Sequence, residues 1–429
     1  MMGSQDHGCE PASGAARVRR ASSVAQHVRD APRVLITDAE TRAVVATVRG
    51  LDTGGFKLVA AAANSALPAA AHWSRSVTER LVVADPLEDE AAFVAAIRHT
   101  LSTTDCAVLI PGSDASLLAL SAARDTLPAS VAHGLPCHEV VERCLNKVSL
   151  ASAASHHELG SPPTSVCTGT AEALTAAREV GLPVLVKPTS SIVEHAGHRQ
   201  RFASVRADDE PSVMAAVNLL GPSVLIQRVE RGPVISFAGV LAGGRLLGEA
   251  LSRYHRTWHP EAGSVSFSQT IAVPDDLRSG IVDLLNDLGW EGLFELELIE
   301  RTRGGWAAID LNPRPYGSLA LAIGAGVNLP AIWCAHLLGR DCEPTSARPG
   351  VQYRWEDADL RHALWQARRR NTRAAAAALR VHRGVVHAYF APDDPGPLLA
   401  RAVFLTKTWR RRAWRSALQR TNGGGLGHG

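Results

Sequence analysis

Residues 292–318 read GLFELELIERTRGGWAAIDLNPRPYGS, and this stretch decides the fold of the chain. Apolar and acidic residues alternate from Leu293 to Ile299, so Glu295 and Glu297 share one face of a strand. The other face, Phe294, Leu296 and Leu298, points into a core. A second apolar run, Trp306–Leu311, is the return strand. The stretch therefore predicts a β-hairpin with one acidic face.

The return strand leads into three polar residues at a spacing of two, Asp310, Asn312 and Arg314. A carboxylate, an amide and a guanidinium thus emerge on one side of the hairpin. Hard oxygen ligands of this kind bind Mg²⁺, which keeps several waters and bridges substrate phosphates. We predict that Mg²⁺ (or Mn²⁺) is held by Glu297, Asp310 and Asn312, with Glu295 as a further candidate. The alternative for the two glutamates alone is the solvated face of an amphipathic strand.

This hairpin resembles the metal-binding element of the ATP-grasp superfamily, which ends in a Glu-x-Asn-Pro-Arg signature. In this chain the corresponding residues are Asp310-Leu311-Asn312-Pro313-Arg314, with Asp in place of the longer Glu at the first position. The continuation through residues 317–320 and 324–330, GSLA and GAGVNLP, is also similar to the family. The resemblance covers roughly residues 33–340. It implies an enzyme that uses ATP to activate a carboxylate as an acyl phosphate.

The fold class expected on these grounds is mixed α/β and α+β, an ATP-grasp fold. Apolar runs that alternate with helical stretches near the N-terminus indicate a parallel α/β layer. The expected division is a disordered leader (1–31), a parallel α/β pre-grasp domain (32–138), two α+β lobes that enclose ATP (139–230 and 231–344) and a C-terminal extension (345–429).

Composition excludes several other classes. The net charge is +3 over 429 residues, so no broad basic excess is present to bind nucleic acid. Seven cysteines without a CxxC pair read as reduced, buried thiols. No apolar run of 18 residues or N-terminal apolar region is present, so neither a membrane span nor secretion is supported and the cytoplasm is expected. No GxGxxG follows the first strand and no GxxxxGK[ST] occurs, so neither motif explains nucleotide binding.

Two lysines are candidate phosphate ligands. Lys187 ends the apolar strand 182–188, and a Lys on such a strand needs a partner anion. Lys147 lies in a stretch that we interpret as one helix, Glu139–Leu159. By the resemblance, both lysines reach ATP, and the loop 189–201 covers the phosphates. This loop offers basic side chains in place of glycines: His195, His198, Arg199 and Arg201.

The segment from Gln227 to Glu230 follows an apolar run that begins at Ser223. The resemblance implies that it joins the two lobes, with Gln227, Arg228 and Val229 beside the purine and Glu230 on the ribose. The alternative is an edge strand that ends at Gly232.

Residues 254–268, YHRTWHPEAGSVSFS, form the densest unexplained polar stretch. We interpret it as a loop over the γ-phosphate and the acceptor carboxylate, with Arg256 and His259 as charged contacts. Together with Arg314 these two complete the catalytic candidates.

Asp114 follows the strand run 107–110 and either caps the helix that begins at Ala115 or contacts substrate.

Residues beyond 345 carry a weaker family signal. The sequence predicts an added edge strand at Val351–Trp355, then one Arg- and Ala-rich helix through Arg380. Residues 401–420 contain no acid, and they form a helix that either packs on the enzyme, the favoured reading, or lies on an anionic membrane surface.

The sequence therefore predicts an ATP-dependent carboxylate–amine (or carboxylate–thiol) ligase whose small-molecule substrates it does not name. A carboxylase that accepts bicarbonate and a non-catalytic nucleotide-binding protein stay open as alternatives.

Overall fold

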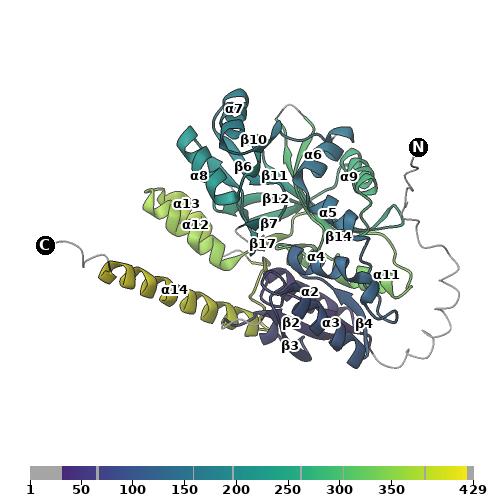
Figure 1. Cartoon of the computed structure of the whole chain (residues 1–429). Coiled ribbons are helices and arrows are strands. Elements are labelled where there is room, and N and C mark those ends of the chain that lie inside the picture. Colours follow the sequence, from purple (N-terminus) through teal and green to yellow (C-terminus); the bar gives the residue numbers. More distant parts are fainter. Residues whose placement is uncertain are drawn as a thin grey trace.

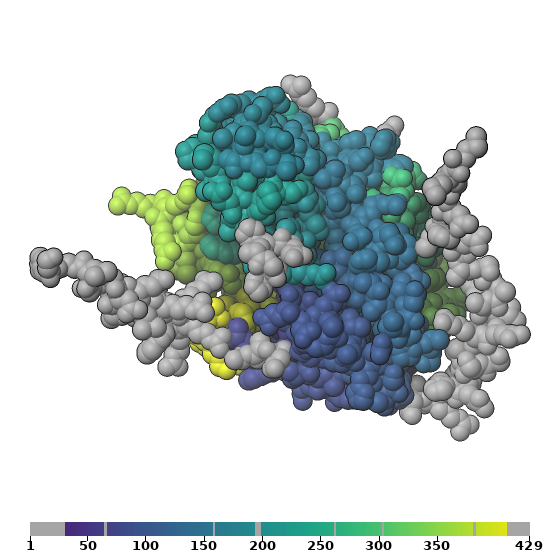
Figure 2. Space-filling model, in the orientation of Figure 1, coloured from purple at the N-terminus to yellow at the C-terminus, as the bar shows by residue number. Residues whose placement is uncertain are grey.

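The computed structural model describes residues 31–63, 67–157, 159–195, 198–260, 263–302, 304–380 and 383–422. The expected leader lies almost entirely outside these ranges. Figure 1 shows three layers along the molecule: an N-terminal sheet at the base, a large sheet in the middle and a smaller sheet with α7 and α8 at the top. In Figure 2 the smaller sheet forms a teal lobe above the purple N-terminal segment.

The N-terminal sheet is parallel, with the strand order β3-β2-β1-β4, as the sequence predicts. Its strands are β1 (Arg33–Ile36), β2 (Lys57–Ala63), β3 (Glu79–Val83) and β4 (Cys106–Ile110). Its helices are α2 (Arg42–Thr53), α3 (Glu90–Thr103) and α4 (Asp114–Ala122), with short 3₁₀ turns η1 (Ala71–Trp73) and η2 (Arg124–Thr126). Helix α2 buries Val44, Val45 and Val48 against the sheet, and this burial holds the layer together.

The predicted helix Glu139–Leu159 is wrong, because the chain forms two helices there, α5 (His138–Leu145) and α6 (Lys147–His156). Asn146 has extended backbone angles, and its side chain accepts hydrogen bonds from the amides of Val148 and Ser149. An Asn that caps a new helix competes with continuation of the old one. The backbone amide of Lys147 donates to the Thr189 carbonyl at 2.9 Å, which ties the start of α6 to the end of the neighbouring strand.

The smaller sheet is antiparallel, with the order β5-β10-β6-β9. Its strands are β5 (Thr164–Thr168), β6 (Val184–Pro188), β9 (Val205–Ala207) and β10 (Ser223–Arg228), and its helices are α7 (Thr170–Val180) and α8 (Glu210–Leu220). The segment predicted as a phosphate-covering loop contains a two-stranded hairpin, β7 (Ile192–His195) and β8 (His198–Arg201).

The large sheet has the order β15-β14-β11-β12-β13-β17-β18, with β16 paired to β12. The strands are β11 (Val234–Ala242), β12 (Arg245–Trp258), β13 (Ser264–Ile271), β14 (Gly292–Glu300), β15 (Trp306–Asn312), β16 (Thr345–Ser346), β17 (Gln352–Arg354) and β18 (Val386–His387). Helix α9 (Asp275–Leu288) packs on this sheet, and its residues Leu277, Ile281 and Leu284 share a core with Phe294 and Leu296.

The interpretation of residues 254–268 as a loop is wrong. Tyr254–Trp258 continues β12, and β13 begins at Ser264 and pairs with it. The strand pattern is hidden in the sequence because Ser266 and Ser268, which alternate with Val265 and Phe267, are themselves fully buried. Burial of both faces removes the alternation by which a half-buried strand is recognised.

The C-terminal part adds α10 (Leu319–Gly324), α11 (Leu329–Leu337), α12 (Glu356–Arg368), α13 (Thr372–Leu379) and α14 (Gly396–Asn422). The single helix predicted through Arg380 is wrong, because the chain breaks at Arg370, whose φ is +60°, and Asn371 caps α13. The start of α14 packs on the protein through buried Ala400 and an ion pair between Arg401 and Asp357 at 2.8 Å. Side chains from residue 410 onward lie outside the description. No helix in the described ranges is long and apolar enough to cross a membrane.

Candidate nucleotide and metal site

The acidic hairpin forms as the sequence predicts. In the register of β14 and β15, Glu295 lies opposite Asn312 and Glu297 lies opposite Asp310. Glu295 is only 4% exposed, whereas Glu297 is half-buried. The four polar side chains therefore gather on one face of two neighbouring strands, and Phe294, Leu296 and Leu298 are buried on the other.

Hydrogen bonding differs between the two glutamates. Both oxygens of Glu295 are used: Oε1 accepts from Ser236 at 2.7 Å and from Ser318 at 3.3 Å, and Oε2 accepts from the Asn312 amide nitrogen at 3.1 Å. Among the residues that the structure describes, one donates to Glu297: the Tyr254 hydroxyl, to Oε1 at 3.0 Å. Glu297 thus keeps an oxygen for a cation, and of the two carboxylates it is the better candidate ligand.

Crowding of these carboxylates perturbs their protonation. Burial, followed by the charges of Glu295 and Asp310, raises the pKa of Glu297 to about 8. Burial also raises the pKa of Glu295. Like charges held together in a desolvated place oppose ionisation, and a cation would relieve that cost.

Both predicted lysines reach the hairpin from other elements. The ammonium of Lys147, at the start of α6, contacts the Asp310 carboxylate. Lys187, at the end of β6, is buried and donates to the Ile309 carbonyl at 3.2 Å. Burial and the neighbouring Lys147 lower the pKa of Lys187 to about 8. An anion such as a phosphate would favour the charged form of both lysines.

Arg314 is buried, and its main partner comes from the N-terminal sheet. Its guanidinium bonds Asp114 twice, at 2.5 Å and 3.2 Å, and also donates to the Asn312 amide oxygen at 2.8 Å. Arg201 of β8 approaches the same Asp114 at 3.3 Å. Asp114 is not the helix cap, because the Ser113 side chain caps α4. Its position after β4 was the only sequence signal for this contact.

The predicted hinge does join two sheets, since residues 229–233 connect β10 to β11. The Gln227 amide donates to Thr164 at 2.9 Å, which anchors this strand to β5. Glu230 forms ion pairs with Arg228 at 3.5 Å and Arg301 at 3.4 Å. Its Oε2 is buried and has no hydrogen bond from any described residue. Val229 lies between Arg228 and Glu230 in the chain and is half-buried.

Arg256 and His259 point to the C-terminal helices. The Arg256 guanidinium makes two hydrogen bonds with Asp359 of α12, at 3.0 Å and 2.7 Å, and lies over the ring of Phe267. The His259 ring packs edge-on against Trp365 of α12. These contacts do not bring either side chain to the hairpin, so their predicted catalytic role gains no support.

Sequence reasoning did not single out Ser236, Ser318 or the Tyr254 hydroxyl, all of which contact Glu295 or Glu297. Tyr254 belongs to the polar stretch 254–268, but no sequence signal connects it to β14, which is separated from β12 by β11 in the sheet. The contact depends on strand order.

Among the residues that the structure describes, no three His, Cys, Asp or Glu side chains form a metal site by themselves. Two facing carboxylates with Asn312 beside them still fit Mg²⁺, which usually takes one or two protein carboxylates and completes its shell with water and phosphate. The raised pKa of Glu297 is the further sign that the cluster suits a cation.

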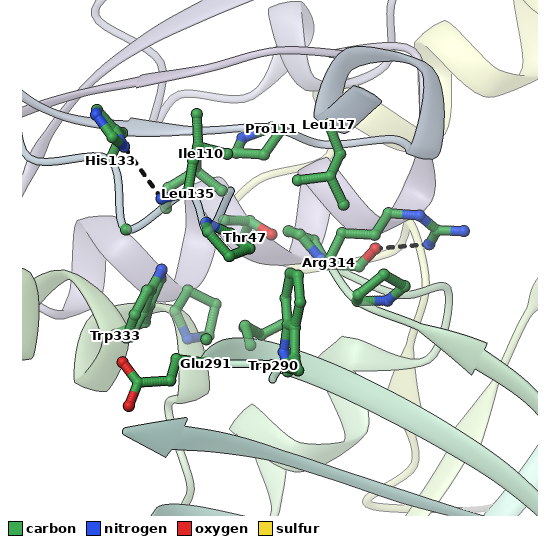
Figure 3. Close-up of a pocket in the computed structure, with 17 residues that line it drawn as sticks. Thr47, Ile110, Pro111, Leu117, His133, Leu135, Trp290, Glu291, Arg314 and Trp333 are labelled. Carbon is green, nitrogen blue, oxygen red and sulfur yellow. Dashed lines mark hydrogen bonds between the residues drawn. The ribbon is translucent and has the colours of Figure 1, made fainter. Parts of the chain in front are cut away.

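A different cavity, shown in Figure 3, lies between the N-terminal sheet and α11. Thr47, Leu135, Trp290 and Trp333 line it, and the buried Trp290 indole nitrogen has no partner within the described ranges. Its volume of about 30 Å³ has room for about one water. A nucleotide requires hundreds of Å³, so this cavity is not the nucleotide site.

No family model matches the sequence, and no curated protein matches it. Among solved structures, the chain is similar to N5-carboxyaminoimidazole synthetase from Staphylococcus aureus in complex with ADP, at 12% identity and a TM-score of 0.59 over 75% of this chain and 81% of that chain. It is also similar to L-amino acid ligase from Bacillus licheniformis (16%, TM-score 0.55, 72% and 75% of the chains). A third is biotin carboxylase from Campylobacter jejuni (13%, TM-score 0.55, 72% and 71%).

These solved structures are ATP-grasp proteins. The chain therefore has the ATP-grasp fold, which confirms the fold predicted from residues 292–318.

Proposed function

We propose that the protein is an ATP-dependent ligase that activates a carboxylate as an acyl phosphate and joins it to an amine or a thiol. ADP and phosphate are the other products. The observation that carries this proposal is the meeting of Lys147 and Lys187, from two separate elements, with the paired Glu297 and Asp310 of the hairpin. Cations for phosphate and carboxylates for a divalent metal are the two requirements of phosphoryl transfer.

ATP would lie between the smaller sheet and the large sheet, next to the hinge that joins them. Gln227, Arg228 and Val229 would border the purine, and Glu230 would bind the ribose. The Oε2 atom of Glu230 supports this, because among the described residues the buried oxygen has a long ion pair with Arg228 at 3.5 Å but no hydrogen bond, and it can accept one from a ribose hydroxyl.

Mg²⁺ (or Mn²⁺) would be held by Glu297, Asp310 and Asn312, with Glu295 as the residue that orients Asn312. When bound, the metal neutralises negative charge on the β- and γ-phosphates. Lys187 and Lys147 add two positive charges at the same place, and Lys147 would exchange Asp310 for phosphate. Arg314 contributes a charge beside Asn312, and Asp114 holds it there. These residues would together favour the transition state through fixed charges.

Two alternatives have specific support. A carboxylase would form carboxyphosphate from bicarbonate, as the likeness to biotin carboxylase suggests; ADP release that depends on bicarbonate alone identifies it. A non-catalytic nucleotide-binding protein is favoured by the shorter Asp310, whose carboxylate already has Lys147 as a partner. Metal-dependent turnover with any acceptor excludes that alternative.

The test has two stages. Calorimetry should first detect ATP binding with Mg²⁺, with a Kd between the micromolar and millimolar ranges typical of enzymes. ADP release is then measured against pools of carboxylates and amines. Absence of binding to ATP and ADP in the presence of metal would refute the proposal.

A further inference from the structure

The Tyr254 side chain links β12 to the acidic face of β14. It is 9% exposed, and its hydroxyl lies 3.0 Å from Glu297 Oε1 and 3.4 Å from Glu295 Oε1. Strand β11 lies between the two strands, so the phenol crosses a full strand to reach the carboxylates. Ser236 of β11 lies opposite Glu297 in the register of the two strands.

Among the described residues, the Tyr254 hydroxyl is the group that donates a hydrogen bond to Glu297. Glu295 differs, since Ser236, Ser318 and Asn312 also donate to it. Loss of the Tyr254 hydroxyl would therefore leave the Glu295 carboxylate held in place and the Glu297 carboxylate free to rotate. Partners of this kind, which orient a ligand without touching the metal, change metal affinity by about 10- to 100-fold.

We propose that Tyr254 is a positioning residue that fixes the rotamer of Glu297 for a nucleotide-bound divalent cation. This inference rests on the proposed function. It extends that function to β12, which supplies no predicted metal ligand.

A matched control is available in Tyr353 of β17, which is separated from β12 by β13. Tyr353 is fully buried, and its hydroxyl donates to the Gly317 carbonyl at 3.0 Å. Tyr353→Phe removes one buried hydroxyl, as Tyr254→Phe does, but the hydrogen bond that it loses is to a backbone carbonyl and both carboxylates stay untouched.

The test uses Mn²⁺ as a spectroscopic probe, because bound and free Mn²⁺ differ in their paramagnetic resonance signal. The full-length wild type, Tyr254→Phe and Tyr353→Phe are titrated with Mn²⁺ at saturating ADP. We expect the Mn²⁺ Kd to rise about tenfold in Tyr254→Phe and to stay within about twofold of the wild type in Tyr353→Phe. In a double-mutant cycle with Glu297→Gln, the two losses should not add, because Tyr254 acts through Glu297.

Three outcomes would overturn the inference. One is an unchanged Mn²⁺ Kd in Tyr254→Phe while the wild type binds Mn²⁺ and ADP, which leaves the proposed function standing. Another is that the losses of Mn²⁺ affinity caused by Tyr254→Phe and by Glu297→Gln add fully in the double variant. The third is a Tyr254→Phe chain that fails to fold in the presence of chelator while Tyr353→Phe folds, since the hydroxyl would then be structural. A wild type that binds ADP but no Mn²⁺ would instead refute the proposed metal site and, with it, this role of Tyr254.

Discussion

Two clusters of charged side chains differ in what the sequence predicted of them: it marked all of the first as functional, but only Arg256 of the second. The first, the hairpin cluster, consists of Glu295, Glu297, Asp310, Lys147 and Lys187. The second, the α12 cluster, consists of Asp357 and Asp359 with their arginine partners, Arg256, Arg354, Arg361 and Arg401. Both clusters contain charges that are largely removed from water.

Their charge balance differs. In the α12 cluster each carboxylate has two guanidinium partners, and the arginines hold the pKa of Asp357 below its usual value despite burial. In the hairpin cluster three carboxylates crowd together, and the pKa of Glu297 is raised to about 8. The α12 cluster therefore has no excess charge for a ligand to balance, whereas the crowded carboxylates of the hairpin cluster favour the approach of a cation.

The largest expected effect breaks the α12 cluster. Asp359→Ala leaves Arg256 and Arg354 buried without their carboxylate, so we expect the free energy of unfolding to fall by about 3–5 kcal/mol. Asp393→Ala is the control, because its ion pair with Arg75 is exposed and such pairs contribute at most about 1 kcal/mol. Urea denaturation measures both. Equal losses in the two variants would show that the α12 cluster is not structural.

The second effect is on chemistry at the hairpin cluster. Asp310→Asn should reduce ADP release by about 100-fold, close to 3 kcal/mol of transition-state stabilisation, because a metal ligand and its charge are lost. It should also shrink the rise in melting temperature that Mg²⁺ gives in the presence of ATP. Arg354→Lys, a change in the α12 cluster, should leave ADP release near the wild-type rate. A Mg²⁺-dependent rise that is unchanged in Asp310→Asn would favour the non-catalytic alternative.

The third effect is a pH dependence of nucleotide affinity through Lys187. Its pKa in the free protein is about 8, and a bound phosphate favours the protonated form, so binding takes up a proton above that pH. Measured with a chelator, so that ionisation of Glu297 for a metal does not contribute, ATP affinity should therefore be flat below pH 8 and fall above it by at most tenfold per pH unit, about 1.4 kcal/mol. Lys187→Arg, which stays charged, should flatten the profile. Calorimetry at pH 7 and pH 9 checks this, and a wild-type affinity equal at both values would contradict it.

The smallest expected effect sharpens the reading of Asp310. Asp310→Glu restores the residue typical of the superfamily and adds one methylene at a half-exposed position. The Mg²⁺-dependent rise in melting temperature should be preserved or increased. Loss of that rise would mean that the hairpin geometry is matched to the shorter side chain.

Local patterns predicted the secondary structure well where one face of an element is apolar. The hairpin follows such a pattern, with Phe294, Leu296 and Leu298 buried on its apolar face. The errors fall where local preferences compete. Asn146 has a helical context on both sides but caps the second helix, and the buried serines of β13 hide its strand period.

The resemblance of residues 310–314 and their continuation to a family signature predicted the ATP-grasp fold. The sequence by itself determined the acidic face of the hairpin, because an alternation of period two within nine residues is enough to place carboxylates on one side of a strand. Only the tertiary structure decided which charges are partners. Arg314 bonds Asp114 across 200 positions of the chain, and Arg256 bonds Asp359 across 103. Tyr254 reaches Glu297 across an intervening strand. These pairings depend on strand order and on the packing of separate layers, and no short-range pattern of residues encodes either.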